Sequence, residues 1–581
     1  MTINKRNKPI HGGHRMILVI VLCLFGLCLV QSKRAPKKKP RAKTSERVYL
    51  VHADMLRYDQ FGSVPDAQIL NGNVAFRHKG ARLTCDSAYF YQASNSFKAF
   101  GHVKMLQGDT LSLFSDYAFY DGDNQMAEAR KNVVLTHRGT KLYTDSLNYD
   151  RLYGIGYFFE GGRMVDKTNV LVSDWGEYDT ETREAVFNYD VSLKNKKFLL
   201  NTDTLYYDTK TSVAHVVGDS RITSGKSIIN TTDGFYDTSK DVARLYGRST
   251  LVNEGRRVTG DSLFYDDKSG ISRGFKNVVY TDDNNKNELE CNYFWYNEKV
   301  GTALATDSAV LKDFSQKDTL YVHSDTIRMY TYNIDTDSVY RTAHCYNKVR
   351  AFRTDVQAVC DSLVYNSKDS CMTMYKDPIT WNADRQLLGE VIEVYMRDST
   401  LDRVHVINQA LSAELLHDKE HYNQVASREM FAYFNKGELT GTEAQGNVMV
   451  VFYPIDDKDS TMMGLVYLET DTLRMFMKNR QLQRIWTPKN NGIMYPMTQI
   501  PPMRYKLPNF AWFDYIRPVD KQDIFNWRGK ESGTELKTIV RHAAPLQKIS
   551  GGKVNTVSVN AIPPDQTPAT DALKPEDNAG K

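Results

Sequence analysis

The sequence Thr144-Asp145-Ser146-Leu147-Asn148-Tyr149 decides the fold of this chain, because close versions of it recur. They stand at residues 202–207 (TDTLYY), 260–265 (GDSLFY) and 360–365 (CDSLVY). The acidic position returns at intervals of 29 residues through Asp116, Asp145, Asp174 and Asp203, and related acidic positions run from Asp54 to Glu390. A period near 29 held over this length indicates one stacked array of repeated units.

A second phrase, which places valine after Gly, His or Asn, lies between successive acidic phrases. Examples are Gly72-Asn73-Val74, Gly101-His102-Val103 and Lys131-Asn132-Val133. Because successive side chains of a strand face opposite sides, Leu147 and Tyr149 share one face. Polar turn residues separate the phrases. We therefore expect an all-β fold with two strands of roughly five to eight residues in each unit and one apolar, aromatic face.

Two architectures would enclose that face. One is a long β-jelly-roll of stacked antiparallel strands, folded lengthwise into a V or taco shape, and the alternative is a parallel β-helix. Tight polar turns favour antiparallel neighbours, because parallel strands need longer connections.

The composition divides the chain into five parts. Residues 1–32 contain the apolar run 16–30 behind a basic start, which predicts a signal peptide or a membrane anchor. Residues 33–47 form a basic linker, and residues 48–480 form the repeat array. Residues 481–544 are rich in Pro and aromatics and are expected to cap the terminal strands. Residues 545–581 have the composition of a disordered tail.

Charge and cysteine usage exclude several classes of function. The net charge is only +5, and much of the positive charge precedes residue 48, which argues against nucleic acid as a partner. Three cysteines, Cys85, Cys291 and Cys360, stand directly before the repeated acidic position, which is occupied by Asn292 in one of these units, and a small packed residue is expected there. No zinc-type spacing occurs, so we expect no metal and no cofactor.

The carboxylates are interpreted as structural. Pairs such as Asp121 with Asp123 and Asp266 with Asp267 fall in predicted turns, where Asp bonds the backbone. The repeated Asp is expected to bond backbone amides or a neighbouring Ser or Thr hydroxyl. No catalytic residue is expected. The alternatives are a polysaccharide-degrading β-helix enzyme, which needs a local break in the repeat, and a surface adhesin or structural rod.

Ala53-Asp54-Met55-Leu56-Arg57-Tyr58 followed by Gly72-Asn73-Val74 resembles the OstA-like (organic solvent tolerance-like) family of periplasmic lipopolysaccharide-transport bridge proteins. The resemblance extends with decay to about residue 475, and this chain carries many more repeats than the family's familiar bridge proteins. It implies a V-shaped jelly roll whose apolar interior shields the acyl chains of lipopolysaccharide or a similar amphipathic lipid between the inner and outer membranes.

The resemblance also implies a location, partners and a lining. The location is the periplasm, with the N-terminal apolar segment as an inner-membrane tether if it is retained. The partners are an inner-membrane transporter and an outer-membrane β-barrel translocon, joined by strand addition at exposed edges. The expected lipid-contacting residues are Leu56, Tyr58, Val74, Phe76, Phe90, Val103, Met105, Tyr120, Val133, Leu135, Leu147, Tyr149, Leu205, Tyr207, Leu263, Tyr265, Val278 and Tyr280, followed by Leu363 and Tyr365. A closed core would use the same side chains, so the sequence leaves that alternative open.

Overall fold

The computed structural model describes residues 47–334, 336–398, 400–456, 461–478 and 481–531. The predicted signal or anchor segment, nearly all of the basic linker and the tail lie outside the described residues. Among the residues that are described, no helix is both long and apolar enough to cross a membrane.

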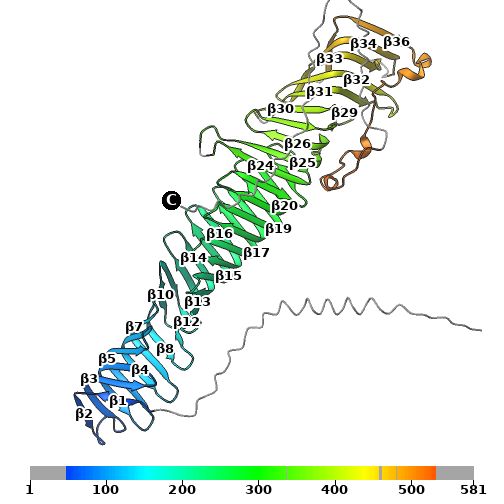
Figure 1. Ribbon diagram of the computed structural model, residues 1–581. Coiled ribbons are helices and arrows are strands. Elements are labelled where there is room, and N and C mark those ends of the chain that lie inside the picture. Colours follow the sequence, from blue (N-terminus) through cyan, green and yellow to red (C-terminus); the bar gives the residue numbers. More distant parts are fainter. Residues whose placement is uncertain (1–46, 335, 399, 457–460, 479–480, 532–581) are drawn as a thin grey trace, which may run out of the picture. The chain divides into compact units, whose positions relative to one another are not determined.

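The described chain forms one sheet of 36 strands, in which neighbours along the stack follow one another closely in sequence (Figure 1). The long strands are β3 (Gln68–His78), β4 (Ala81–Tyr91), β5 (Ser96–Gln107), β6 (Leu111–Asp121), β7 (Met126–His137), β8 (Thr140–Asp150), β13 (Glu184–Lys194), β14 (Leu199–Asp208), β15 (Val213–Ser224), β16 (Ser227–Asp237), β17 (Val242–Asn253), β18 (Arg256–Asp266), β19 (Ile271–Asp282), β20 (Asn287–Asn297), β25 (Tyr340–Phe352), β26 (Gln357–Asn366), β31 (Thr400–Leu415), β32 (Tyr422–Asn435), β33 (Glu438–Phe452) and β34 (Leu465–Lys478).

Shorter strands complete the sheet. They are β1 (Tyr49–His52), β2 (Met55–Tyr58), β9 (Ile155–Phe158), β10 (Gly162–Asp166), β11 (Asn169–Ser173), β12 (Trp175–Asp179), β21 (Thr302–Thr306), β22 (Val310–Asp313), β23 (Leu320–His323), β24 (Thr326–Tyr332), β27 (Cys371–Tyr375), β28 (Ile379–Asn382), β29 (Arg385–Leu388), β30 (Val391–Arg397), β35 (Gln481–Trp486) and β36 (Asn490–Tyr495). Four 3-10 turns follow: η1 (Met497–Gln499), η2 (Pro502–Arg504), η3 (Asp514–Ile516) and η4 (Asp523–Phe525).

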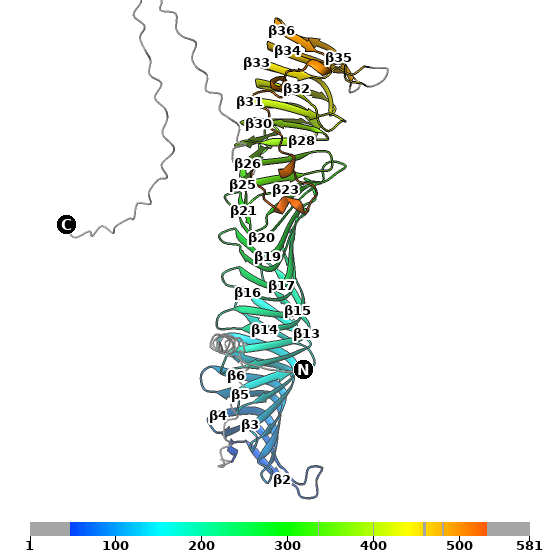
Figure 2. The same ribbon diagram turned by 90° about the vertical axis from the view of Figure 1, so that its right-hand side faces the viewer.

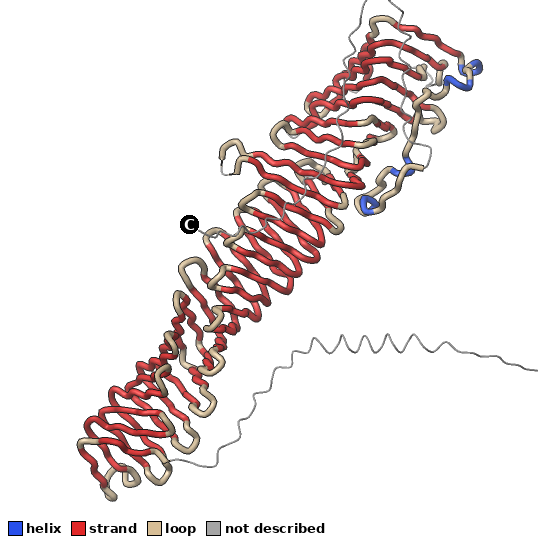
Figure 3. Tube along the Cα trace, viewed as in Figure 1, coloured by secondary structure: helices blue, strands red, loops and turns tan. Residues whose placement is uncertain are grey.

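Every strand pairing in the described residues is antiparallel, for example β3 with β4 and β7 with β8. The prediction of an all-β jelly roll of stacked antiparallel strands is therefore confirmed, and the parallel β-helix alternative is wrong. Figure 3 shows the same stacking as an almost unbroken series of strands.

Each long strand bends near its middle, and the bend divides the sheet into two walls. The pairing of β3 with β4 breaks between Asn71 and Val74, and the pairing of β7 with β8 breaks between Arg130 and Val133. Wall A contains β1, residues 74–78 of β3, residues 81–85 of β4 and the half-strands paired after them. Wall B contains β2, residues 68–71 of β3, residues 87–91 of β4 and their successors.

The short strands show the same division, because they are long strands interrupted at the bend. Residues 141–144 of β8 pair with β10 in wall A, and residues 147–150 pair with β9 in wall B. Two strands per repeat were predicted correctly, but the predicted length of five to eight residues was too short. β4 spans 11 residues and β5 spans 12, because the repeated phrases mark bends inside strands rather than strand ends.

The bend explains why Asp and Gly-Asn recur together. Gly72 and Asn73 both have the left-handed backbone conformation, with φ of 76° and 46°. The side-chain amide of Asn73 donates to Asp54 Oδ2 at 2.9 Å, and a Cβ on residue Gly72 would lie 2.3 Å from the same oxygen. Glycine is therefore required at residue 72 both for its backbone conformation and for the space beside Asp54. The two sequence phrases are the two sides of one contact between neighbouring strands.

The same contact returns along the array. Asn132 donates to Asp116 at 2.7 Å, and Asn277 donates to Asp261 at 2.7 Å. The bonds from Asn277 and Arg248 hold the pKa of Asp261 below its usual range. Asp361 also accepts from the hydroxyl of its neighbour Ser362, the kind of partner that the sequence predicted.

The side chain of the residue before the repeated Asp also forms a hydrogen bond at the bend. Ser115 donates to the carbonyl of Tyr117 at 2.9 Å, and the Cys360 thiol donates to the carbonyl of Ser362 at 3.3 Å. All five cysteines in the described part of the chain are free and buried. The packed role predicted for Cys85, Cys291 and Cys360 is confirmed.

The C-terminal part differs from the predicted cap. β35 and β36 both pair with β34, so the ladder continues to Tyr495 rather than ending near residue 480. Residues 496–531, here named the strap, then run back beside β32, β29 and β25 instead of covering the last strand (Figures 1 and 2). Residues 532–544 lie beyond the described chain.

Candidate functional site

The space between the walls is closed in the first half of the array. Phe76 and Phe97 stack there with their ring centroids 4.2 Å apart, and Phe97 also contacts Tyr120. Leu147 and Tyr149 are completely buried. These residues belong to one hydrophobic cluster that extends from Val48 to Leu263. The apolar face of this half is therefore a packed core.

Polar side chains join the two walls where the strands turn, along an edge here named the mouth. His78 of wall A contacts the Tyr120 hydroxyl of wall B at 2.7 Å, and His137 contacts the Tyr178 hydroxyl at 2.9 Å. Burial lowers the pKa of His137, which favours its neutral form. Arg151 donates to Tyr120 at 2.6 Å.

The last bridges of this half lie near residues 166–241. The Tyr207 hydroxyl donates to Asp166 Oδ2 at 2.8 Å and accepts from Asn169 at 2.8 Å. Lys197 of wall A forms an ion pair with Asp241 of wall B. The partners Asp166 and Tyr207 are 41 residues apart, and Lys197 and Asp241 are 44 apart. The mouth of the first half is thus closed by contacts that skip from one repeat to a later one.

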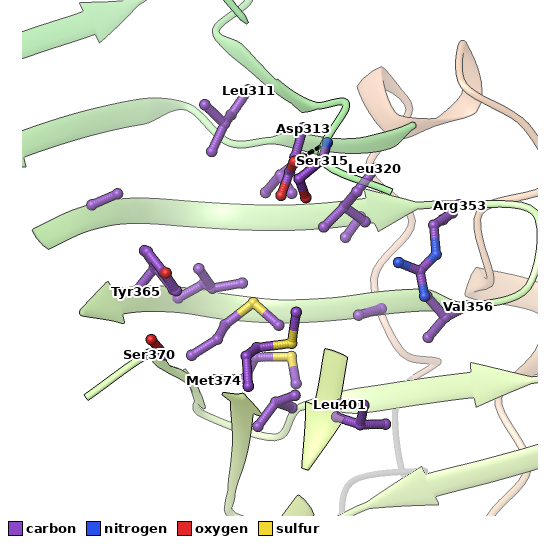
Figure 4. A pocket seen from close by; sticks show the side chains of 18 of the residues that line it. Leu311, Asp313, Ser315, Leu320, Arg353, Val356, Tyr365, Ser370, Met374 and Leu401 are labelled. Carbon is purple, nitrogen blue, oxygen red and sulfur yellow. Dashed lines mark hydrogen bonds between the residues drawn. The ribbon is translucent and has the colours of Figure 1, made fainter. Parts of the chain in front are cut away.

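In the second half the walls stand apart and enclose a cavity of about 3160 Å³. It begins near Ile222 and Ile229 and continues to Met475 and Met477 of β34. Its apolar lining includes Leu251, Val258, Tyr265, Tyr280, Leu289, Phe294, Leu311, Leu320, Met329, Leu363, Tyr365, Met372, Met374, Val394, Leu401, Val404, Met430 and Leu473. Figure 4 shows Leu311, Leu320, Met374 and Leu401, from strands of both walls, beside this space.

Methionine is prominent in this lining. Met329, Met372, Met374, Met430 and Met475 all face the cavity. An unbranched, polarisable side chain adapts its shape to its neighbour. The lining therefore suits a flexible apolar ligand better than a rigid one.

The rim of the cavity is polar, and hydrogen bonds there run along wall A. Arg353 donates to Gln316 at 3.0 Å, and Asn382 donates to the Asp355 carbonyl at 2.8 Å. Inside the mouth, burial raises the pKa of Tyr280 to about 12 and also raises the pKa of Tyr265. The cavity thus has an apolar interior and a polar edge.

The predicted lining residues fall into three groups. Leu56 and Tyr58 are 53% and 60% exposed on β2, at the N-terminal edge of the sheet. Tyr265, Tyr280, Leu363 and Tyr365 line the cavity. The other predicted residues are buried in the two hydrophobic clusters: Val74, Phe76, Phe90, Val103, Met105, Tyr120, Val133, Leu135, Leu147, Tyr149, Leu205, Tyr207, Leu263 and Val278. Contact of any of them with lipid stays a prediction.

The sequence did not predict the methionines of the cavity lining or the lining residues beyond β27. Met372 and Met374 alternate along β27 as cavity residues should, but this short strand lacks the aromatic phrase. The signal that could have found them is the alternation of two methionines on one face.

The carboxylates in turns behave as interpreted. Asp121 accepts the backbone amides of Asp123 and Asn124, and Asp266 accepts the amide of Ser269. Within the described ranges no group of three or more His, Cys, Asp or Glu side chains could hold a metal ion.

Comparisons with known proteins relate one part of this chain to a protein family. No curated protein sequence matches this chain. One similar solved structure is LptH from Pseudomonas aeruginosa, the LptA homologous periplasmic component of the conserved lipopolysaccharide transport device; the alignment has 17% identity and a TM-score of 0.18 and covers 21% of this chain and 81% of LptH. The model of the OstA-like protein family matches residues 45–203, which include the best example of the repeated phrase. The predicted resemblance is confirmed over residues 45–203, here named the OstA-like segment, and its extension to about residue 475 stays a prediction.

Proposed function

We propose that this protein is a periplasmic lipid-binding bridge that shields the acyl chains of lipopolysaccharide, or of a similar amphipathic lipid, between the inner and outer membranes. The observation that carries the proposal is the cavity of about 3160 Å³ with an apolar lining and a polar rim. Acyl chains would occupy the interior while the head group stays at the hydrated mouth.

The size of the cavity favours a large ligand. Pockets for one drug-sized molecule measure roughly 300–1,000 Å³, so this cavity has room for several acyl chains together. The OstA-like segment supports the same ligand class, because the family resemblance implies lipid shielding.

The ends of the sheet support docking to partners. At the first end, Val51 of β1 and Met55 of β2 are exposed. At the other end, Trp486 of β35 and Ile493 of β36 are exposed. Edge strands with unpaired backbone groups and apolar side chains favour strand addition. The proposed partners are an inner-membrane transporter, which would supply the energy, and an outer-membrane β-barrel translocon.

The test is photo-crosslinking in living cells from two matched tyrosine positions. Tyr365 faces the cavity and is 38% exposed, whereas Tyr375 faces away from it and is 40% exposed. A photoreactive residue at Tyr365 should capture lipid, and the same residue at Tyr375 should not. Equal capture at both positions, or none at either, would contradict a lipid-binding interior.

Depletion of the protein distinguishes transport from the other classes. A bridge predicts that lipopolysaccharide accumulates at the inner membrane. Unchanged lipid distribution with altered surface attachment would indicate an adhesin or structural rod, and turnover of polysaccharide by the purified protein would indicate an enzyme.

A further inference from the structure

The strap follows the outer face of wall A, across the strands and against the direction of the sequence. Its contacts come in order. Gln424 of β32 binds residues 505–507, Gln386 of β29 binds residues 511–513, and Arg350 of β25 binds Ile516 and Asp523. Phe525 then meets the His323 ring of β23 at 4.8 Å. Figures 1 and 2 show the strap beside these strands in both views.

Two glutamine side chains fix the strap, each through both the NH2 and the oxygen of its amide. Gln386 donates to the Ala511 carbonyl at 2.9 Å and accepts the Phe513 amide at 2.8 Å. Gln424 donates to the Tyr505 carbonyl at 2.8 Å and accepts the Leu507 amide at 2.8 Å. Each side chain satisfies one backbone donor and one backbone acceptor, as a neighbouring strand would. The strap is therefore held in one register.

Charged and apolar contacts complete the attachment. The fully buried Arg350 donates to the Ile516 carbonyl at 3.1 Å and pairs with Asp523 at 3.3 Å. Trp381 is the cross-strand neighbour of Gln357 and Gln386, so the three side chains share one face of wall A, and Trp381 is buried there. Phe513 and Ile516 of the strap are buried as well. The strap and wall A therefore bury apolar side chains between them, as a hydrophobic core does.

The strap lies beside the later part of the region where the walls stand apart: the cavity begins near Ile222, whereas the described contacts of the strap run from β32 to β23. There the bend is interrupted between β21 and β22, β23 and β24, β27 and β28, and β29 and β30, so these half-strands of wall A are not continuous with wall B. In the first half of the array the walls instead bind each other through bridges such as His78 with Tyr120.

One strap residue reaches the rim itself. Arg517 donates to Gln357 Oε1 at 2.8 Å and to the Ala383 carbonyl at 2.9 Å, and all three residues border the cavity. We infer that the strap is a brace: it ties the interrupted half-strands of wall A into one unit and holds them away from wall B, which keeps the cavity open. That the cavity holds lipid rests on the proposed function, but the effect of the strap on the width of the mouth does not.

The inference is tested on the full chain with Gln386→Leu and Gln424→Leu combined. Spin labels carried by unnatural amino acids at Thr354 of wall A and Asp398 of wall B, both on the cavity rim, report the width of the mouth without lipid. Hydrogen exchange at Phe510 and Ile516 reports release of the strap, because these amides donate to the carbonyls of Leu507 and Phe513 and keep their acceptors in the double variant. We expect faster exchange there and a shift of the label-to-label distance to shorter values. The control is Gln445→Leu, because that side chain bonds Glu443 and not the strap.

Freely exchanging strap amides with an unchanged rim distance would overturn the brace. Arg517→Ala is the milder second variant and serves if the double variant fails to fold. It removes the link between strap and rim, together with one ion pair inside the strap to Asp514, and it should also shorten the distance. An unchanged distance in a folded Arg517→Ala protein would count against the inference. A narrowed mouth in a protein that binds no lipid even in its original form would support the brace and refute the lipid-binding function.

Discussion

The closure of the first half is tested most directly at Tyr207. Its hydroxyl donates to Asp166 and accepts from Asn169, and all three side chains are buried. Tyr207→Phe keeps the ring in the core and removes only the oxygen. Thr140 still donates to the other carboxylate oxygen of Asp166 at 3.0 Å. Leaving a buried polar group without its partner costs about 1–3 kcal/mol, and the carboxylate places this case toward the upper end.

The assay is hydrogen exchange followed by mass spectrometry, because a repeat array can open locally without unfolding as a whole. A loss of 2 kcal/mol accelerates exchange roughly 30-fold. We expect this acceleration in β10, β11 and β14 and little change in the second half. The control is Tyr206→Phe, since Tyr206 is 42% exposed and belongs to the same strand. Its effect should stay within about 0.5 kcal/mol.

Equal protection of β10 and β14 in both variants would refute the reasoning. It would mean that the apolar core alone holds the first half closed and that the bridges at the mouth contribute nothing measurable.

Three further predictions concern the bend, the core and the cavity. Gly72→Ala should destabilise the protein more than Gly80→Ala in chemical unfolding: both have φ near +80°, which costs about 1–2 kcal/mol for an L-residue, but only at Gly72 would the Cβ meet Asp54. Leu147→Arg should lower stability by about 4 kcal/mol or more, because it places an unpaired charge in a sealed core; any loss of lipid passage should therefore come with loss of fold in a thermal melt. Since Tyr280 has its pKa raised to about 12 against an unfolded value of about 10, its contribution to stability should be complete below about pH 10 and vanish as pH rises toward 12, a decline that Tyr280→Phe should reduce.

Each has a contrary outcome. Equal destabilisation at Gly72 and Gly80 would show that the contact with Asp54 imposes no constraint. A Leu147→Arg protein that melts like the original would mean that this part of the interior is open to water. An alkaline decline that is identical in Tyr280→Phe would assign it to other tyrosines.

The period and phase of the repeat predicted much of the fold. Leu147 and Tyr149 share the inner face as expected, and the two phrases in each unit correctly predicted two strands per unit. The bend inside each strand was not predictable from one phrase alone, since Asp and Asn suit a turn equally well. Its key contact joins Asp54, between β1 and β2, to Asn73 of β3, 19 residues later.

The difference between the closed and open halves could not be predicted from the repeat. Tyr149 and Tyr365 stand in nearly the same phrase, yet one lies in a sealed core and the other faces a cavity. What separates them is the distance between the walls. That distance depends on contacts far apart in sequence, such as Tyr207 with Asp166 and, in the proposed brace, Gln386 with Ala511, 125 residues away.

The bridges across the mouth have a consequence for how such a chain can change its length. The partners of a bridge are 41 to 45 residues apart, which is about one and a half repeats of 29 residues. Each bridge therefore begins before the previous one ends, and successive bridges overlap along the chain. A cut between two repeats anywhere from residue 137 to residue 207 would leave His137 or Asp166 without the partner described above. Removing or duplicating one whole repeat would bring equivalent partners together again. The closed half can therefore lengthen or shorten only by complete repeats, whereas the open half, whose described rim contacts run along one wall, is not bound by that rule.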